Sequence, residues 1–266
     1  MAESILSTHG LSRSFGPMKA VDDVSLDFPK GAITGLIGPN GAGKSTFFNL
    51  LTGALKPDAG SVRLEGHDVT GLSQAETFAK GLGRTFQIPR PFARMSVLEN
   101  AMLAPTGQVG ETIAGPFLFR KRMRDEETRI REKALEVLDF VTLGPLADHP
   151  AGKISGGQRK LLELARVLMG DPKIILLDEP AAGVNPVLTA TLIGKIEELN
   201  ARGTTFVIIE HDMDFVMRHC EPVIALGQGR VVCQGTADPA PPGPVLLDAH
   251  LRARGAAGAG RARGMA

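Results

Sequence analysis

Short apolar runs alternate with longer mixed segments along this chain, and that pattern sets the first expectation for its fold. The continuous apolar run at 174–177 is typical of a strand buried on both faces. Two further segments predict strands: Ile33–Ile37 and the apolar run within TTFVIIEHD at 204–212. Helices are expected in three places: from Ser45 onward, over 155–170, and near 187–200. Strands that alternate with helices predict an α/β fold, with a mainly parallel core sheet and helices on both faces.

Weaker patterns predict the remaining elements. The segments GSVRLEGHDVTG at 60–71 and PVIALGQGRVVCQG at 222–235 each predict a β pair, the first turning near Gly66. Residues 87–105 predict a proline-broken loop that enters a helix. Residues 120–143 predict a helix of mixed charge, whose basic start favours a solvated face over a binding patch. The apolar stripe of this helix consists of Ala134, Leu135, Leu138 and Val141.

Composition narrows the class of protein without naming a function. The 266 residues are 43% hydrophobic and 22% charged, with a net charge of +1, which is ordinary for a globular protein and unlike a nucleic-acid binder. Glu3 stands where an export signal would carry a basic residue, and no apolar run reaches the ~18 residues of a membrane span. Cys220 and Cys233 lack a metal-type spacing and are expected to be reduced thiols in a cytoplasmic protein.

The segment GPNGAGKS at 38–45 matches a phosphate-binding loop between a strand and a helix. Its glycines let backbone N–H groups turn inward around phosphate oxygens, and the helix adds its positive N-terminal end. Lys44 is expected to contact the β and γ phosphates, and the Ser45 hydroxyl to bind Mg²⁺. A plain glycine turn is the alternative interpretation.

Two adjacent carboxylates, Asp178 and Glu179, end the apolar strand at 174–177. A buried carboxylate is unfavourable unless a cation meets it. We expect Asp178 to hold Mg²⁺ through its water shell, and Glu179 to orient or deprotonate a water beside the γ-phosphate. A metal and a nucleotide would then neutralise this pair, whereas the alternative is a solvated pair at a strand end.

Two further patterns are ambiguous when each is taken alone. His211 leaves a buried strand at the same sheet edge and could hydrogen-bond the γ-phosphate or the attacking water, although most such histidines are structural. ISGGQ at 154–158 opens a helix with Ser155 as the expected N-cap, and Gly156 and Gly157 form an anion nest without a lysine. Gln87, an amide in a loop, is uninformative alone.

In this order the motifs resemble those of the ATP-binding subunit of ABC transporters, over roughly residues 5–236. They are GPNGAGKST (Walker A), Gln87 (Q-loop), ISGGQ (signature), IILLDEP (Walker B), AAGVNP (D-loop) and His211 (switch histidine). The resemblance implies a P-loop NTPase of the ABC ATPase type with an antiparallel β subdomain. It also implies an ATPase domain over 1–238 with a helical subdomain inserted over roughly 87–168. The extension at 239–266, rich in Pro, Gly, Ala and Arg, is expected to be disordered from about 254.

The resemblance also assigns roles by position. The expected ATP contacts are Phe15, Gly38, Pro39, Asn40, Gly41, Ala42, Gly43, Lys44, Ser45 and Thr46, with Ser155, Gly156, Gly157 and Gln158 meeting a partner subunit's ATP. The expected Mg²⁺ ligands are Ser45, Gln87 and Asp178, and the expected catalytic residues are Glu179, His211 and Gln87. Phe15 matches the aromatic that stacks on adenine, and a core position is its alternative.

The segments GRTFQIPRPFARMSVLENAML and DEPAAGVNP look like those of ATPases that power branched-chain amino acid importers. The lipopolysaccharide-export ATPase is the nearest competitor and keeps Asp where Asn185 stands here, and a soluble ABC ATPase such as one of cluster assembly is a further alternative. This branch often has another residue at Gly156, and the tail after Pro239 is less regular than usual.

The importer resemblance implies several partners and a location. The partners are transmembrane permease subunits, a second ATPase subunit that is more often a relative than a copy, and indirectly an extracytoplasmic solute-binding protein; no nucleic acid is implied. The location is the cytoplasmic face of the inner membrane. The loop after Gln87 would dock the permease, and Phe92, Met95, Val97 and Leu98 either line that groove or pack inside the helical subdomain.

Overall fold

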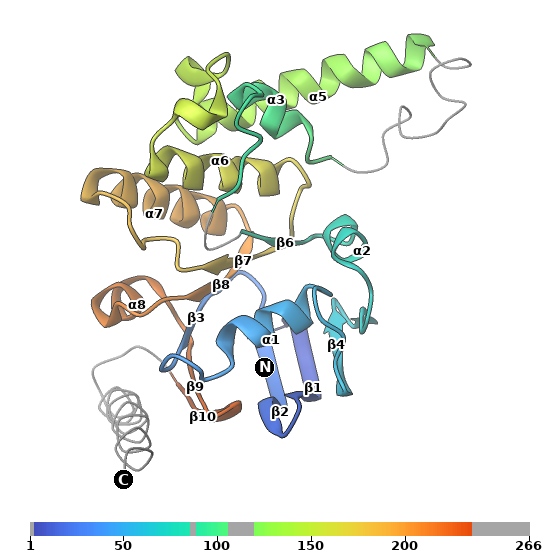
Figure 1. The fold of residues 1–266 in the computed structure, drawn as a ribbon, viewed down its shortest axis with the longest axis vertical. Helices are drawn as coiled ribbons and strands as arrows, with labels where there is room; N and C mark the ends of the chain where they lie inside the picture. The colour runs from blue at the N-terminus through green and yellow to red at the C-terminus, as the bar shows by residue number, and fades with distance from the viewer. Residues whose placement is uncertain (1–2, 86–88, 106–119, 236–266) are drawn as a thin grey trace.

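The structure is a computed structural model that describes residues 3–85, 89–105 and 120–235. Gln87 and the extension at 239–266 lie outside the described residues, so the expectations placed on them stay predictions. The described chain forms two sheets flanked by helices (Figure 1).

The larger sheet has six strands and carries the phosphate-loop strand near its middle. Its strand order is β10 (Arg230–Gly235), β9 (Val223–Gly227), β3 (Ile33–Ile37), β8 (Thr205–Ile209), β7 (Ile174–Asp178), β6 (Leu82–Arg84). Every neighbouring pair is parallel except β9 and β10 at one edge. The prediction of a mainly parallel core sheet is therefore confirmed.

The smaller sheet has four antiparallel strands. Its order is β2 (Met18–Pro29), β1 (Ser4–Phe15), β4 (Ala59–Leu64), β5 (His67–Asp68). The short pair expected at 60–71 is β4 and β5, but the apolar pattern missed the two long strands. The β1–β2 ladder shifts register at several points, for example between Thr8 and Leu11, so the period of two is interrupted there.

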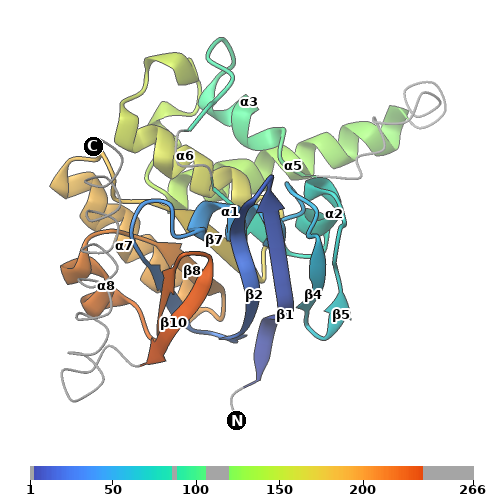
Figure 2. The ribbon, with the colours of Figure 1, turned by 60° about the horizontal axis from the view of Figure 1, so that its bottom comes forward.

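Helices cover both faces of the six-stranded sheet (Figures 1 and 2). Helix α1 (Lys44–Leu51) packs between the two sheets, where Phe47 and Phe48 are fully buried. A second core lies on the opposite face. The other helices of the described residues are α2 (Gln74–Ala79), α3 (Val97–Met102), α5 (Arg120–Phe140), α6 (Gly156–Leu168), α7 (Pro186–Ala201) and α8 (Met213–His219), with short 3-10 turns at Gly144–Leu146 and Ala151–Lys153.

Strand β7 shows why the central strands are mainly apolar. Ile174 and Leu176 point into the core that contains α1, whereas Ile175 and Leu177 point into the core beneath α6 and α7. Successive side chains of a strand face opposite sides, so a strand covered on both sides buries all of its positions, which favours apolar residues throughout. This packing fixes where Asp178 emerges at the end of β7.

Helices α3, α5 and α6 lie together on one side of the large sheet (Figure 1). The predicted stripe is confirmed: on α5, Ala134 and Leu138 are fully buried and Leu135 packs against the same core, and Val141, which directly follows α5, is also fully buried. The helix itself ends at Phe140, three residues before the predicted end at 143. A right-handed helix cannot continue through Thr142, because its φ of 64° lies in the left-handed region.

The described residues bear on two expectations from the composition, which concern membrane-spanning segments and the state of the cysteines. Within them, no helix is both long enough and apolar enough to cross a lipid bilayer. Cys220 and Cys233 are both free thiols, as predicted, and burial raises the pKa of the Cys220 thiol to about 12.

Candidate functional site

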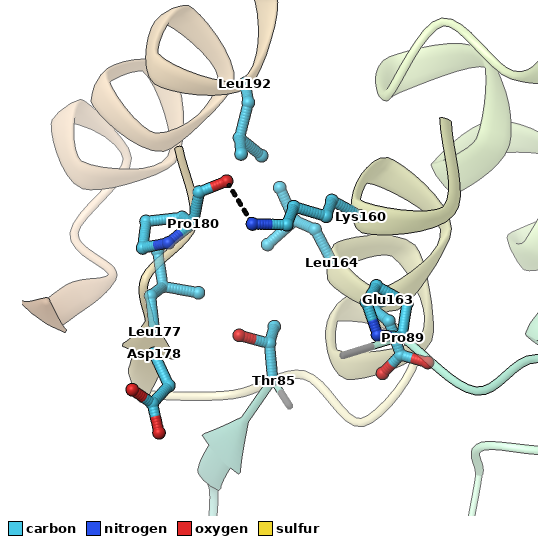
Figure 3. Close-up of a pocket in the computed structure, with 9 residues that line it drawn as sticks. All are labelled: Thr85, Pro89, Lys160, Glu163, Leu164, Leu177, Asp178, Pro180 and Leu192. Atoms are coloured by element: carbon cyan, nitrogen blue, oxygen red, sulfur yellow. Dashed lines mark hydrogen bonds between the residues drawn. The ribbon is translucent and has the colours of Figure 1, made fainter. Parts of the chain in front are cut away.

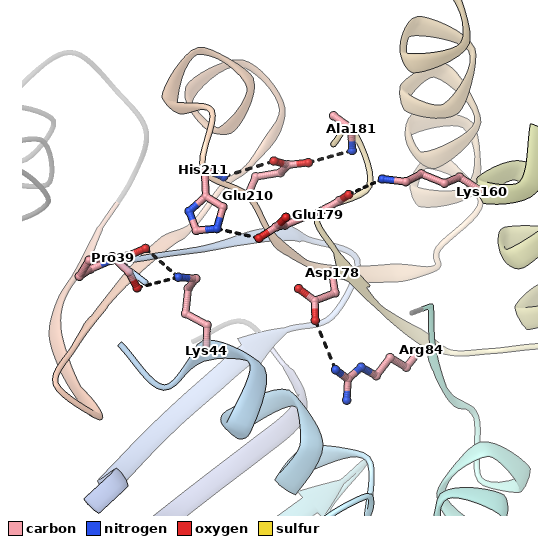
Figure 4. Close-up of polar contacts among 10 residues, drawn as sticks. Pro39, Lys44, Arg84, Lys160, Asp178, Glu179, Ala181, Glu210 and His211 are labelled. Carbon is pink, nitrogen blue, oxygen red and sulfur yellow. Dashed lines mark hydrogen bonds and ion pairs between the residues drawn. The ribbon is translucent and has the colours of Figure 1, made fainter. Parts of the chain in front are cut away.

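Three parallel strands deliver their following residues to one edge of the large sheet. The phosphate loop follows β3, Asp178 and Glu179 come at the end of β7, and His211 follows β8 (Figure 4). The carboxyl ends of parallel strands are where such folds form ligand sites. A hollow of about 320 Å³ opens there, and it is lined by Asn40, Gly41, Ala42, Gly43, Lys44, Ser45, Thr46, Glu179 and His211.

The backbone of the phosphate loop packs tightly against the rest of the chain. Gly43 has φ 99°, and a Cβ atom there would lie 2.2 Å from the carbonyl oxygen of Ala20. Helix α1 begins at Lys44, one residue before the predicted start at Ser45. The first N–H groups of a helix have no partner within it, so this end of α1 offers donors and a positive dipole to an anion in the hollow.

Lys44 supplies the positive charge of the hollow. Its Nζ donates hydrogen bonds to the carbonyl oxygens of Gly38 at 2.7 Å and Pro39 at 3.0 Å. Burial lowers the pKa of Lys44, and the nearby carboxylates of Glu179 and Asp178 oppose that shift. A phosphate in the hollow would give this ammonium a full counter-charge.

Asp178 forms an ion pair with Arg84, which the pattern of apolar and polar residues did not predict. Its side chain is 6% exposed, and its Oδ2 accepts a hydrogen bond from an Arg84 terminal nitrogen at 3.3 Å. Another terminal nitrogen of Arg84 donates to Oδ1 of Asn49 at 2.6 Å, and the guanidinium lies over the Phe48 ring, 5.6 Å from its centroid. The expectation that a metal and a nucleotide neutralise Asp178 is therefore incomplete, because the chain also contributes Arg84.

The Arg84–Asp178 pair lies in an environment that disfavours both charges. Burial raises the pKa of Asp178, and Arg84 opposes that shift. Burial likewise lowers the pKa of Arg84, against the effect of Asp178. Each residue thus compensates for the burial of the other, and removal of either leaves a charge that water does not reach.

Glu179 and His211 are brought into direct contact. His211 Nε2 lies 2.7 Å from Glu179 Oε1, at the wall of the hollow. Glu179 has φ 51°, in the left-handed region that residues with a side chain rarely adopt. The backbone turns there so that Asp178 ends β7 beside Arg84 while the Glu179 carboxylate faces the phosphate loop (Figure 4).

The ISGGQ segment forms the N-terminus of α6 as predicted. Ser155 is the N-cap: its Oγ accepts from the Gln158 N–H at 3.2 Å, and Gln158 Oε1 accepts from the Ser155 N–H at 2.8 Å. The Gln158 side chain is therefore used in the capping box. A Cβ atom on Gly156 would meet nothing within 4 Å, so packing within this chain does not require a glycine there. In the described chain, residues 155–158 are not part of the lining of the hollow.

The structure shows which of the apolar residues with two possible roles lie in the core and which are exposed. Phe15 is 43% exposed at the end of β1, with the Arg13 guanidinium 5.4 Å from its ring centroid, so Phe15 is not a core residue. Val97 and Leu98 are buried in the helical core, whereas Phe92 is 55% exposed. These observations leave Phe15 and Phe92 available for contacts with other molecules.

Asn185 has a local structural role. Its Oδ1 accepts a hydrogen bond from the Leu188 N–H at 2.9 Å and caps α7, with Pro186 as the first helical residue. Aspartate caps helices about as well as asparagine. The capping role of this position therefore does not distinguish the amino-acid importer pattern from the lipopolysaccharide-export pattern.

Known proteins resemble this chain in sequence and in fold. A family profile described as ABC transporter matches residues 21–182. A protein of Archaeoglobus fulgidus, described as a probable branched-chain amino acid transport ATP-binding protein LivG, is 40% identical over 253 residues, 94% of this chain and 96% of that protein. A solved ATP-binding cassette of an ABC transporter in its ADP conformation is 38% identical, with a TM-score of 0.78, over 93% of this chain and 98% of that one. A dimeric ATP-binding cassette bound to ADP and Pi is 25% identical, with a TM-score of 0.71, over 88% and 99% of the two chains.

Proposed function

This chain belongs to the ABC transporter family as one of its ATP-hydrolysing subunits, and on that premise we propose that it powers import of a branched-chain or related hydrophobic amino acid. The Archaeoglobus fulgidus relative is described as a branched-chain amino acid transport ATP-binding protein, and nearly the whole of both chains aligns. The observation that carries the ATPase assignment is the hollow that joins the phosphate loop to Glu179 and His211.

The residues of the hollow fit the triphosphate of ATP. Lys44 and the N-terminal N–H groups of α1 offer positive charge and hydrogen-bond donors to the phosphates. The exposed ring of Phe15 would stack on adenine. Oxygen ligands suit Mg²⁺, so Ser45 and Asp178, with Gln87 as the third expected ligand, would hold the ion that neutralises the phosphate charge.

Phosphoryl transfer to water depends mainly on position and on charge neutralisation. Glu179 is placed to orient the attacking water and to accept its proton, since its carboxylate lines the hollow. His211, in contact with Glu179 Oε1, holds that carboxylate and faces the same space. Gln87, which follows β6 in the sequence, is the third residue that we propose for catalysis.

The partners follow from the family. Dimerisation would bring the phosphates bound by one subunit to Ser155, Gly156 and Gly157 of the other, which accounts for an open N-terminus on α6 without a lysine among these residues. The exposed Phe92 would contact a permease subunit, and a solute-binding protein would act indirectly from the other side of the membrane. The ATPase would then lie at the cytoplasmic face of the membrane.

Lys44→Ala tests the nucleotide site. We expect the Kd for MgATP to rise by about 10-fold or more, because a hydrogen bond to a charged group contributes about 1.5–3 kcal/mol. Isothermal titration calorimetry on the full chain measures this change. Lys56→Ala, at an exposed position after α1, is the matched control and should bind as the wild type does. Equal affinity of Lys44→Ala and wild type would contradict the assignment of the phosphate loop.

A second experiment tests the membrane partner. The full tagged chain, purified from detergent-solubilised membranes, should carry a polytopic membrane protein in near-stoichiometric amount, as judged by mass spectrometry. Phe92→Asp should lose that protein while still binding ATP, whereas Val232→Asp, an equally exposed site on β10, should retain it. Recovery with cytosolic proteins alone would favour the soluble ABC ATPase alternative.

A further inference from the structure

The loop that carries Glu179 is held on one side by a lysine of α6. Lys160 Nζ donates hydrogen bonds to the backbone carbonyl oxygens of Glu179 at 2.7 Å (Figure 4), Pro180 at 3.0 Å (Figure 3) and Ala182 at 2.7 Å. An ammonium group has three protons to donate. All three acceptors therefore come from one short stretch of backbone, and the hydrogen-bonding capacity of Lys160 is filled.

Strand β8 holds the same loop from the other side. Glu210, which is 4% exposed, accepts hydrogen bonds from the Ala181 N–H at 2.9 Å and the His211 N–H at 3.2 Å. The Glu179 N–H donates to the Ile209 carbonyl oxygen at 2.9 Å. The backbone of residues 179–182 is thus fixed between a helix and a strand that come from different parts of the chain.

This loop needs such support because Glu179 adopts an unfavourable backbone conformation. A residue with a side chain at φ 51° has about 1–3 kcal/mol of strain, which persists only where its surroundings hold it. Lys160 holds the carbonyl of Glu179 and Ile209 holds its N–H. With both ends of the residue fixed, its carboxylate is directed at His211 and the phosphate hollow.

The position of Lys160 is unfavourable for a lysine that merely covers a helix surface. Burial lowers the pKa of Lys160, while the carboxylates of Glu210, Glu179 and Asp178 oppose that shift. Its side chain crosses from α6 toward Pro180 beside a cavity of about 20 Å³, which Thr85 and Glu163 also line (Figure 3). The ammonium therefore faces the loop rather than open solvent.

We propose that Lys160, together with Glu210, is a positioning residue for ATP hydrolysis that fixes the loop 179–182 and thereby the Glu179 carboxylate. The inference rests on the proposed role of Glu179 as the residue that orients the attacking water. Helix α6 also begins with the signature residues, so the group that holds Glu179 and the residues expected to meet the partner's nucleotide belong to one helix. Hydrolysis in one site would then depend on the placement of α6 in the same chain.

Lys160→Met, which keeps the length of the side chain but donates no hydrogen bond, tests the proposal. We expect kcat to fall by about 10- to 100-fold with KM and the Kd for MgATP nearly unchanged, since a displacement of about 1 Å can lower a rate by that factor. Lys160→Gln retains two donors and should recover part of the loss. Lys153→Met, at an exposed position just before α6, is the control and should leave kcat unchanged.

The readouts separate positioning from simple stability. Turnover is measured well below the unfolding temperature of each variant, where a merely structural lysine would leave kcat at the wild-type value. Glu210→Gln has a single acceptor oxygen for the Ala181 and His211 N–H groups, where Glu210 uses one oxygen for each. It serves as a second variant if Lys160→Met does not fold, and it should lower kcat without a change in KM. In the double variant, the two losses should be less than multiplicative, because both residues act on one loop.

Two results would overturn the proposal, and they are distinguishable. If Glu179→Gln is inactive but Lys160→Met and Glu210→Gln turn over as the wild type does, the loop does not need this support while the role of Glu179 stands. If Glu179→Gln itself turns over ATP normally, the proposed role of Glu179 fails and the inference fails with it.

Discussion

Glu179→Gln is expected to abolish most ATP turnover while MgATP binding is retained. The amide is nearly the same size as the carboxylate but cannot accept a proton from the attacking water. General-base catalysis contributes about 10²- to 10⁴-fold, so kcat should fall by about that factor. Steady-state phosphate release measures turnover, and calorimetry measures binding. The structure supports the pairing of these outcomes, because Glu179 lines the hollow while Lys44 carries the charge for the phosphates.

Glu132→Gln provides the matched control for this substitution. Glu132 lies on the exposed face of α5, so the same chemical change there should affect neither turnover nor binding. Loss of MgATP binding in Glu179→Gln would mean that Glu179 holds the ligand rather than the attacking water. Turnover at the wild-type rate would mean that another group accepts the proton.

Arg84→Met is expected to destabilise the nucleotide-free protein by about 3–5 kcal/mol, the range found when one partner of a buried ion pair is removed. The substitution leaves Asp178, 6% exposed, without its guanidinium partner, and it also removes the donor to Asn49. Chemical denaturation followed by circular dichroism gives the free energy of unfolding. The reference variant is Arg63→Met, on an exposed position of β4, which should unfold close to the wild type.

The cause of this destabilisation can be isolated with a second substitution. If the uncompensated charge of Asp178 is responsible, Arg84→Met combined with Asp178→Asn should be more stable than Arg84→Met alone. An unfolding midpoint of Arg84→Met equal to that of the wild type would show that Asp178 does not depend on Arg84. If the double variant is no more stable than Arg84→Met, the loss of stability comes instead from the missing hydrogen bond to Asn49 and the missing contact with the Phe48 ring.

The patterns that were interpreted correctly from the sequence are local ones. The runs at Ile33–Ile37 and 174–177 correspond to β3 and β7, because a strand covered on both faces is mainly apolar, with Thr34 as a buried polar exception in β3. The N-cap at Ser155 was also predictable, since a capping box needs two residues three positions apart. In contrast, β1 and β2 were missed: register shifts interrupt the period of two in β1, whereas β2 keeps a signal that could have predicted it, the alternating buried residues Val24, Leu26 and Phe28.

The sequence by itself determined which chemistry this protein can carry: a glycine loop with Lys44, a strand that ends in Asp178 and Glu179, and a histidine after the next strand. Each of these motifs is a short continuous stretch of sequence, so each can be recognised without knowledge of the fold. The tertiary structure alone decided that Arg84, 94 positions away, meets Asp178, and that Lys160 reaches the carbonyls of the Glu179 loop. The Arg84–Asp178 contact requires β6 to lie beside β7. The Lys160 contacts require one face of α6 to lie against the Glu179 loop. Neither arrangement produces a periodic pattern of apolar residues in the sequence, so neither could be predicted from it.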